Sequence, residues 1–271
     1  MISVRWYGIP CILIISAAAQ AGTREDCMQH TDRKLSTEAC TTAINSGGDV
    51  AWAYYHRGVN QFLDRNLAMA DYTKAIELDP RLAAAYMARG SLYRQANQQD
   101  LAIADYSKAI AINPNDAFAY NARGIAYGGP HFGEKGDHDS AIADFTKAIE
   151  LKPDFGYAYR NRGKSWRDKK DLVRAIADYT RAIELDPKDG ITYTERGVAH
   201  VLRREYDLAI ADQEKAVEFA PSYYRGTIYF NRGMAYFAAG NREKALADAN
   251  KALEIDPKNQ SYIEFRNRIW P

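Results

Sequence analysis

Cysteine and histidine are the residues of this sequence whose side chains most often do catalytic or metal chemistry. Cys27 and Cys40 are too far apart for the Cys-x-x-Cys at a helix start that is typical of a catalytic redox pair. His131 and His138 lie with several acids in the segment 128–139, where they could ligate a metal. Because that segment contains four glycines and a proline, nothing in it fixes a coordination geometry. We therefore expect a long turn without a bound metal.

Arginine and aspartate recur along the chain in two matched rows. A row of arginines on one surface could bind an anionic ligand through bidentate contacts. Each arginine has an aspartate further along the chain, however, and we expect the two rows to neutralise each other. The arginines are Arg57, Arg89, Arg123, Arg162, Arg196 and Arg232, and the aspartates are Asp71, Asp105, Asp144, Asp178, Asp212 and Asp248.

An enzymatic role is not expected from the remaining polar residues. A catalytic site needs a nucleophile, base or metal held singly in a cleft, whereas most polar residues here recur with a fixed period. The sequence has no Gly-rich phosphate loop, nucleophile elbow or metal-binding helix motif. We therefore expect no catalytic residue and no cofactor.

Charge and composition further narrow the classes of protein to which the chain could belong. The chain of 271 residues has 36 Lys and Arg against 35 Asp and Glu, and this balance argues against nucleic-acid binding. Apolar and charged fractions of 46% and 26% are close to globular averages.

The first 21 residues are typical of a secretory signal peptide. Arg5 gives a positive start, an apolar stretch runs over 9–19, and Ala19-Gln20-Ala21 is a small-x-small cleavage pattern. We expect cleavage after Ala21 and an exported protein, periplasmic or secreted. The alternative is an uncleaved N-terminal anchor in the membrane. In an oxidising compartment Cys27 and Cys40 would form a disulfide by default, the alternative being two buried free thiols.

Six prolines mark an internal repeat in the sequence. They recur at a period of 34 residues, with two small insertions, and this indicates one supersecondary unit stacked on copies of itself. Each unit reads as two helices, with small residues where the helix backbones must cross closely. Asn97 and Gly240 fall between the helices of their repeats, where a left-handed residue is favoured. The prolines are Pro80, Pro114, Pro153, Pro187, Pro221 and Pro257.

These features resemble the tetratricopeptide repeat (TPR) over residues 51–257. Position 4 of the motif is Tyr in all six copies, and positions 20 and 27 are always Ala, with few departures elsewhere. Gln213 and Ala249 replace the aromatic of position 24. The resemblance implies an all-α, right-handed superhelical solenoid of antiparallel helix pairs, with a concave groove lined by the first helix of each pair.

Extending the 34-residue repeat frame in both directions gives an interpretation of both ends of the chain. One period upstream, residues 22–50 read as a degenerate partial repeat in which Cys27 and Cys40 take the aromatic positions 11 and 24. A bridge between them would staple this shortened hairpin. One period downstream, residues 258–271 read as a single capping helix, with Tyr262, Ile263, Arg266 and Trp270 in frame.

The frame also places the charged rows, at positions 7 and 23. It leaves open whether each arginine pairs with the aspartate of its own repeat or of the preceding one. Within-repeat pairing would leave Arg266 of the cap alone, whereas the other scheme would leave Arg57 facing Ala39.

The resemblance places a partner-binding groove on the first helices. Repeat 4 supplies the basic centre, and repeats 1 and 6 supply apolar side chains, a combination that suits a peptide with acidic and apolar anchors. The alternative is that the apolar members are packed between helices and repeat 4 is a solvated charged face. The groove residues are Tyr55, Val59, Tyr157, Arg160, Asn161, Lys164, Arg167, Phe230 and Met234.

Two functions follow as hypotheses. The first is a non-catalytic scaffold or adaptor that binds a protein or peptide of unknown identity in the groove. The second is a structural or membrane-anchored envelope component that uses an uncleaved N-terminal segment.

Overall fold

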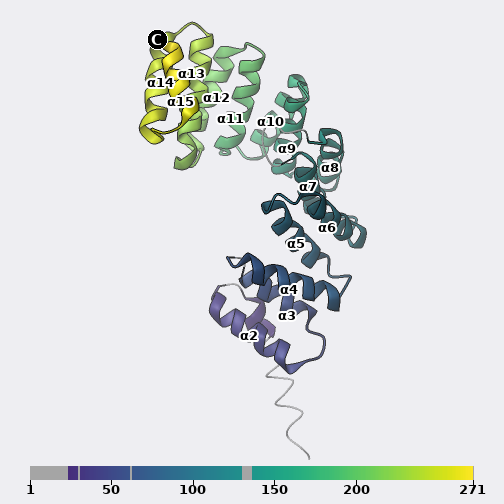
Figure 1. Cartoon of the computed structure of the whole chain (residues 1–271). Helices are drawn as coiled ribbons and strands as arrows, with labels where there is room; N and C mark the ends of the chain where they lie inside the picture. The colour runs from purple at the N-terminus through teal and green to yellow at the C-terminus, as the bar shows by residue number, and fades with distance from the viewer. Residues whose placement is uncertain (1–23, 30, 62, 130–135, 271) are drawn as a thin grey trace, which may run out of the picture. The chain divides into compact units, whose positions relative to one another are not determined.

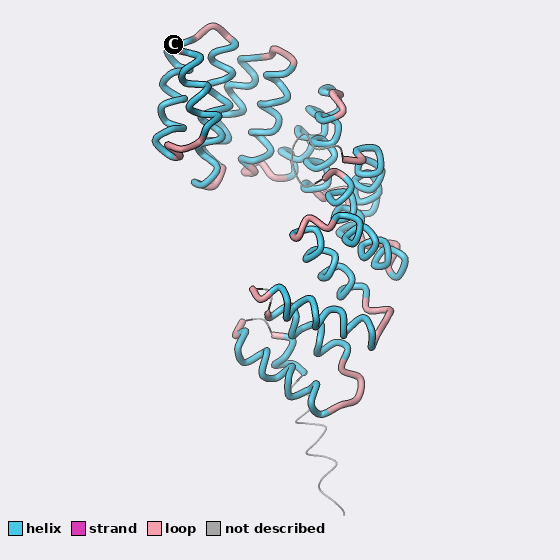
Figure 2. Tube along the Cα trace, viewed as in Figure 1, coloured by secondary structure: helices cyan, strands magenta, loops and turns pink. Residues whose placement is uncertain are grey.

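The computed structural model describes residues 24–29, 31–61, 63–129 and 136–270. Within these ranges the regular elements are all helices, joined by short turns (Figure 2). The predicted signal peptide and the part of the long turn that contains His131 lie outside the described residues.

The chain divides into two compact units after Asn115. In the first unit, residues 24–28 are helical and precede five further helices, each of which packs on the next (Figure 1). The first helices of repeats 1 and 2 also touch each other. The five helices are α2 (Arg33–Ser46), α3 (Ala51–Asn60), α4 (Arg65–Leu78), α5 (Ala83–Gln95) and α6 (Gln99–Ile112).

The second unit contains repeats 3 to 6 and the C-terminal helix. Each helix again packs on the next, and α9 touches α11 as α11 touches α13, so the first helices form one layer. The elements are α7 (Ala117–Tyr127), α8 (His138–Leu151), α9 (Gly156–Asp168), α10 (Leu172–Leu185), α11 (Gly190–Leu202), α12 (Tyr206–Phe219), the short 3-10 helix η1 (Ser222–Tyr224), α13 (Arg225–Ala238), α14 (Arg242–Ile255) and α15 (Gln260–Ile269).

In repeats 1 to 4, the two helices of each pair share one recurring contact between a glycine and an aromatic ring. In repeat 2, a Cβ added to Gly90 would lie 2.8 Å from Cε1 of Tyr106, which is closer than carbon atoms approach. The aromatic ring therefore packs directly on the glycine backbone. Ala102 and Ala109 beside it are fully buried or nearly so. This confirms the steric reason expected for small residues at the crossing.

The turns between paired helices use the left-handed backbone conformation. Asn97 has φ of 58° and Gly240 has φ of 84°, as predicted. Lys170 and Arg204 take the same conformation at the equivalent place of repeats 4 and 5, with φ of 67° and 64°. A side chain with a Cβ is disfavoured there, so these two turns carry strain.

The last helix, α15, covers repeat 6 with one residue that the repeat frame marks, Tyr262, and with two that it does not, Phe265 and Ile269. Tyr262, Phe265 and Ile269 are buried, whereas Arg266 and Trp270 are exposed. Phe265 lies against Gly233, 3.0 Å from where a Cβ would be. The ring of the cap thus fills the space that Ala249, in place of an aromatic, leaves open in repeat 6.

Candidate protein-interaction face

The charged rows form an ion-pair ladder within each repeat. Arg162 donates from Nε and Nη2 to both carboxylate oxygens of Asp178, each at 2.8 Å, and the other five repeats show the same two contacts at 2.7–2.9 Å. Of the two pairing schemes that the sequence leaves open, the structure has the one within repeats. The six aspartates are buried, with 3–7% of their surface exposed.

In repeats 1, 2, 4 and 5 the same arginines also tie the repeat to the one before it. Nη1 of Arg162 donates to Oγ1 of Thr146 at 3.1 Å, and Arg57, Arg89 and Arg196 each donate to a preceding Thr at 3.0–3.3 Å. Hydrogen bonding to Asp178 raises the pKa of Arg162 above its ordinary value. All six guanidinium groups are thus paired with an aspartate, and the row does not form a surface for an anionic ligand.

The predicted basic centre on α9 is only partly available to a partner. Arg167 has 4% of its side chain exposed and pairs with Glu195 and Asp168, so it does not belong to an accessible basic patch. Burial acts to lower the pKa of Arg167, but the combined effects of Glu195, Tyr179 and Asp168 outweigh it, and the pKa is raised. Arg160 donates to Asp189 at 2.9 Å and is likewise neutralised.

Three other residues of α9 are at least partly exposed to solvent. Tyr157 has 61% of its surface exposed. Asn161 is half-buried and donates from Nδ2 to Oδ1 of Asn121 on α7 at 3.0 Å. Lys164 is half-buried and has no ion pair among the described residues. The positive charge that α9 offers a partner is thus that of Lys164.

The apolar groove residues of repeats 1 and 6 are largely packing residues. Tyr55 and Val59 pack against the buried cluster that contains Tyr72. Phe230 lies against Tyr262 and Phe265, with ring centroids 5.2 and 5.4 Å away. Met234 differs from them, because 39% of its surface is exposed.

Sequence reasoning missed Phe118 of α7. It is 56% exposed and occupies the same helix position as Tyr157 one repeat later. The shared repeat position of Phe118 and Tyr157 was the signal from which Phe118 could have been found. The neutralising acid Glu195 had no such signal, because no other repeat has an acid at its position.

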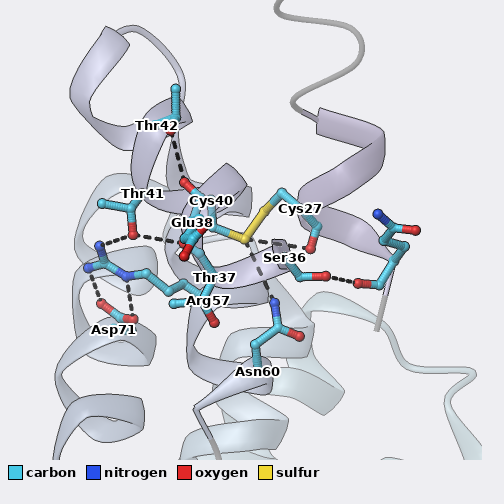
Figure 3. The surroundings of a disulfide bond; sticks show 11 residues. Cys27, Ser36, Thr37, Glu38, Cys40, Thr41, Thr42, Arg57, Asn60 and Asp71 are labelled. Atoms are coloured by element: carbon cyan, nitrogen blue, oxygen red, sulfur yellow. Dashed lines mark hydrogen bonds and ion pairs between the residues drawn. A yellow bond between two sulfur atoms is a disulfide. The ribbon is translucent and has the colours of Figure 1, made fainter. Parts of the chain in front are cut away.

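The disulfide lies in the N-terminal partial repeat (Figure 3). Cys27 and Cys40 are joined with a Cα–Cα distance of 4.7 Å, and neither side chain is exposed. Nδ2 of Asn60, from α3, approaches Sγ of Cys40 at 3.9 Å, and Oγ of Ser36 donates to the backbone oxygen of Gln29 (Figure 3). The predicted disulfide is confirmed. Because it is buried, it can hold the two segments of the partial repeat together.

Neither a metal site nor a membrane span is found in the described part of the chain. It has no group of three His, Cys, Asp or Glu side chains that could hold a metal ion. No helix among the described residues has the length and apolar character needed to cross a bilayer.

A stack of antiparallel helix pairs with periodic glycine–ring contacts defines a helical-repeat scaffold. Sequence models of the family match most of its length: "TPR repeat" over 90–129, and "Tetratricopeptide repeat" over 128–190, 174–224 and 227–259. The chain belongs to the tetratricopeptide repeat family, whose members generally bind other proteins and lack catalytic activity.

Solved structures agree with this fold. A tetratricopeptide repeat protein from Parabacteroides merdae is 19% identical, with a TM-score of 0.69 over 94% of this chain and 100% of that one. PilW, a type IV pilus biogenesis factor, is 19% identical, with a TM-score of 0.70 over 80% and 99%. YrrB, described as having an unusual peptide-binding site, is 26% identical, with a TM-score of 0.55 over 72% and 97%. No curated protein matches the sequence significantly.

Proposed function

We propose that this protein is a scaffold that binds a protein or peptide partner on the first helices of repeats 3 to 6. The observation that carries the proposal is the solvent-facing side of α9, where the exposed Tyr157 and the half-buried Lys164 lie two turns apart and outside the ion-pair ladder. Seven residues separate them, about 10 Å along the helix axis. The peptide-binding site named for YrrB, which is 26% identical, supports a role of this kind.

The expected partner segment has an acidic anchor for Lys164 and an apolar one for Tyr157. Arg160 and Arg167 contribute little long-range attraction, because Asp189 and Glu195 neutralise them within the protein. An aromatic ring and one charge are typical of the central anchors of a protein interface.

The sharpest test is the Lys164→Glu variant. Reversing Arg160 or Arg167 would break internal ion pairs, whereas Lys164 has none among the described residues. We expect Lys164→Glu to lose partner capture by the purified protein from an envelope extract, with thermal stability unchanged. The matched control is Lys108→Glu, which makes the same charge change at an exposed position of the second helix α6. Equal capture by both variants would contradict the proposal.

Export to the periplasm or the medium is part of the same proposal, with the motif of residues 1–21 as its support. The competing role is an anchored envelope component that retains this segment. The intact mass of the protein recovered from cells separates the two. A mature chain beginning at Gly22 is expected for the scaffold, whereas a mass that includes Met1, found in the membrane fraction, would favour the anchored component.

A further inference from the structure

The second unit has a hollow of about 310 Å³ at the edge of the layer of first helices, between the loops that join repeats 3, 4 and 5. Its walls come from Phe118 on α7, from Phe155 and Tyr157 at the start of α9, and from Leu185 at the end of α10. This volume lies at the lower end of the range of ligand sites, and fits one large side chain of a partner.

Gly156, the first residue of α9, lines the hollow. A Cβ built on Gly156 would meet nothing nearer than Leu185 Cβ at 3.7 Å. The equivalent Gly190 of repeat 5 has no such room, since its Cβ would lie 2.4 Å from the backbone nitrogen of Ala220. At Gly226 in repeat 6, the ring of Tyr262 occupies the space, 3.3–3.4 Å from a Cβ. Of these three equivalent glycines, Gly156 is the one at which a Cβ would make only ordinary van der Waals contacts.

The polar rim of the hollow has an excess of negative charge. Asp154, Asp186 and Asp189 line it, together with one cation, Lys152. Arg160 pairs with Asp189, whereas no ion pair of Asp154 or Asp186 occurs among the described residues. The rim therefore carries one uncompensated negative charge.

The aromatic walls have faces that accept cations. Nζ of Lys152 lies 5.1 Å from the ring centroid of Phe118 and 5.7 Å from that of Phe155. Cζ of Arg160 lies 4.9 Å from the centroid of Tyr157. More than half of the surface of Phe118 and of Tyr157 remains exposed, so a second cation could reach these rings.

We propose that this hollow binds an arginine side chain of a partner protein. Its aliphatic stem would lie on Leu185, its guanidinium plane against an aromatic ring, and its N–H groups would donate to Asp154 or Asp186. The inference rests on the proposed function in one respect, namely that the ligand is a segment of protein. It adds a basic anchor to the acidic one expected at Lys164, so the partner segment would carry both charges.

Three blocked pentapeptides, Ala-Ala-X-Ala-Ala with X as Arg, Leu or Glu, provide the probe. Titrated into the isotope-labelled protein, the Arg peptide is expected to shift the amide signals of residues 154–157 and 185–189, and the Leu and Glu peptides much less. Gly156→Leu should abolish the shifts by filling the hollow. Gly156→Ala, which has room for its methyl group, is the matched control for the loss of glycine at this position.

Charge variants keep the test decisive if Gly156→Leu does not fold. Replacing both free acids, Asp154→Asn and Asp186→Asn, should weaken binding of the Arg peptide by about three- to fivefold, the strength of exposed ion pairs. Lys152→Met should strengthen it, because a competing cation is removed. Equal shifts with the Leu peptide, unchanged binding to the Asp variants or weaker binding to Lys152→Met would overturn the proposal. Lys164→Glu separates the two sites, since it should leave binding of the Arg peptide unchanged even if partner capture fails.

Discussion

Arg162 and Asp178 form a bidentate ion pair across the two helices of repeat 4, with both contacts at 2.8 Å. The carboxylate is almost buried, with 10% of its side chain exposed, and the third guanidinium nitrogen reaches Thr146 of the preceding repeat. One side chain thus fixes the geometry inside a repeat and the spacing between repeats. Because the other repeats contain the same pair, the stack depends on a row of such contacts.

Replacing Asp178 by Asn is therefore expected to destabilise repeats 3 to 5 far more than loss of a surface ion pair. Removing one partner of a buried pair leaves an uncompensated charge, and we expect a cost of about 2–4 kcal/mol. Glu150→Gln breaks the exposed pair with Lys147 on α8 and should cost less than about 0.5 kcal/mol. Amide hydrogen exchange of α8, α9 and α10 measures both. Equal effects of the two variants would show that the ladder adds no stability.

The sequence alone was sufficient to predict what recurs with the period. The helix pairs, the glycine–ring contact of Gly90 and Tyr106, and the turn at Asn97 follow from local propensity and packing that each repeat satisfies by itself. The Cys27–Cys40 bridge was predictable because the repeat frame brings both positions to one helix crossing.

Contacts between non-periodic residues could not be predicted in this way. Arg167 on α9 is buried by Glu195 on α11, and that meeting depends on how neighbouring repeats stack, which a pattern of spacings does not encode. The hollow beside Gly156 has the same origin, since Gly190 has an identical sequence position and no space. The division after Asn115 has no counterpart in the repeat pattern either.

The strained turns offer a stabilising change. Lys170 and Arg204 have positive φ values in turns where repeat 6 has Gly240. Lys170→Gly and Arg204→Gly should each stabilise the second unit by about 0.5–1 kcal/mol, because glycine adopts this conformation without steric cost and only part of the gain is offset by the freer unfolded chain. Gly240→Lys is the reverse control and should destabilise by a similar amount. Urea midpoints measure all three, and a lower midpoint for Lys170→Gly would refute the assignment of strain.

Alkaline pH is expected to destabilise the first unit through Tyr72. Burial raises the pKa of Tyr72 from 10.0 to about 12 in the folded protein. The folded state therefore keeps this proton after the unfolded state has lost it. The stabilisation is fully present below pH 10 and is lost between pH 10 and about 12, on the order of 2–3 kcal/mol.

The Tyr72→Phe variant tests this assignment. It retains the ring on Gly58 but cannot ionise, so its stability should fall less steeply above pH 10 than that of the natural protein. Urea unfolding across this pH range gives the difference. Ultraviolet titration of both folded proteins gives the ionisation of Tyr72 as the difference between the two curves. We expect Tyr72 to ionise near pH 12, and ionisation near pH 10 would contradict the burial argument.

The disulfide should stabilise the N-terminal partial repeat locally. It closes a loop of about 14 residues, for which the chain-entropy model gives roughly 3 kcal/mol. In a Cys27→Ala, Cys40→Ala variant, we expect the amides of α2 to exchange much faster, whereas those of α9 to α15 in the other unit should be unchanged. Reductant should accelerate exchange of α2 in the natural protein and have no effect on the variant. If α2 is equally protected with and without the bridge, its packing on α3 alone holds the partial repeat in place, and the staple is dispensable.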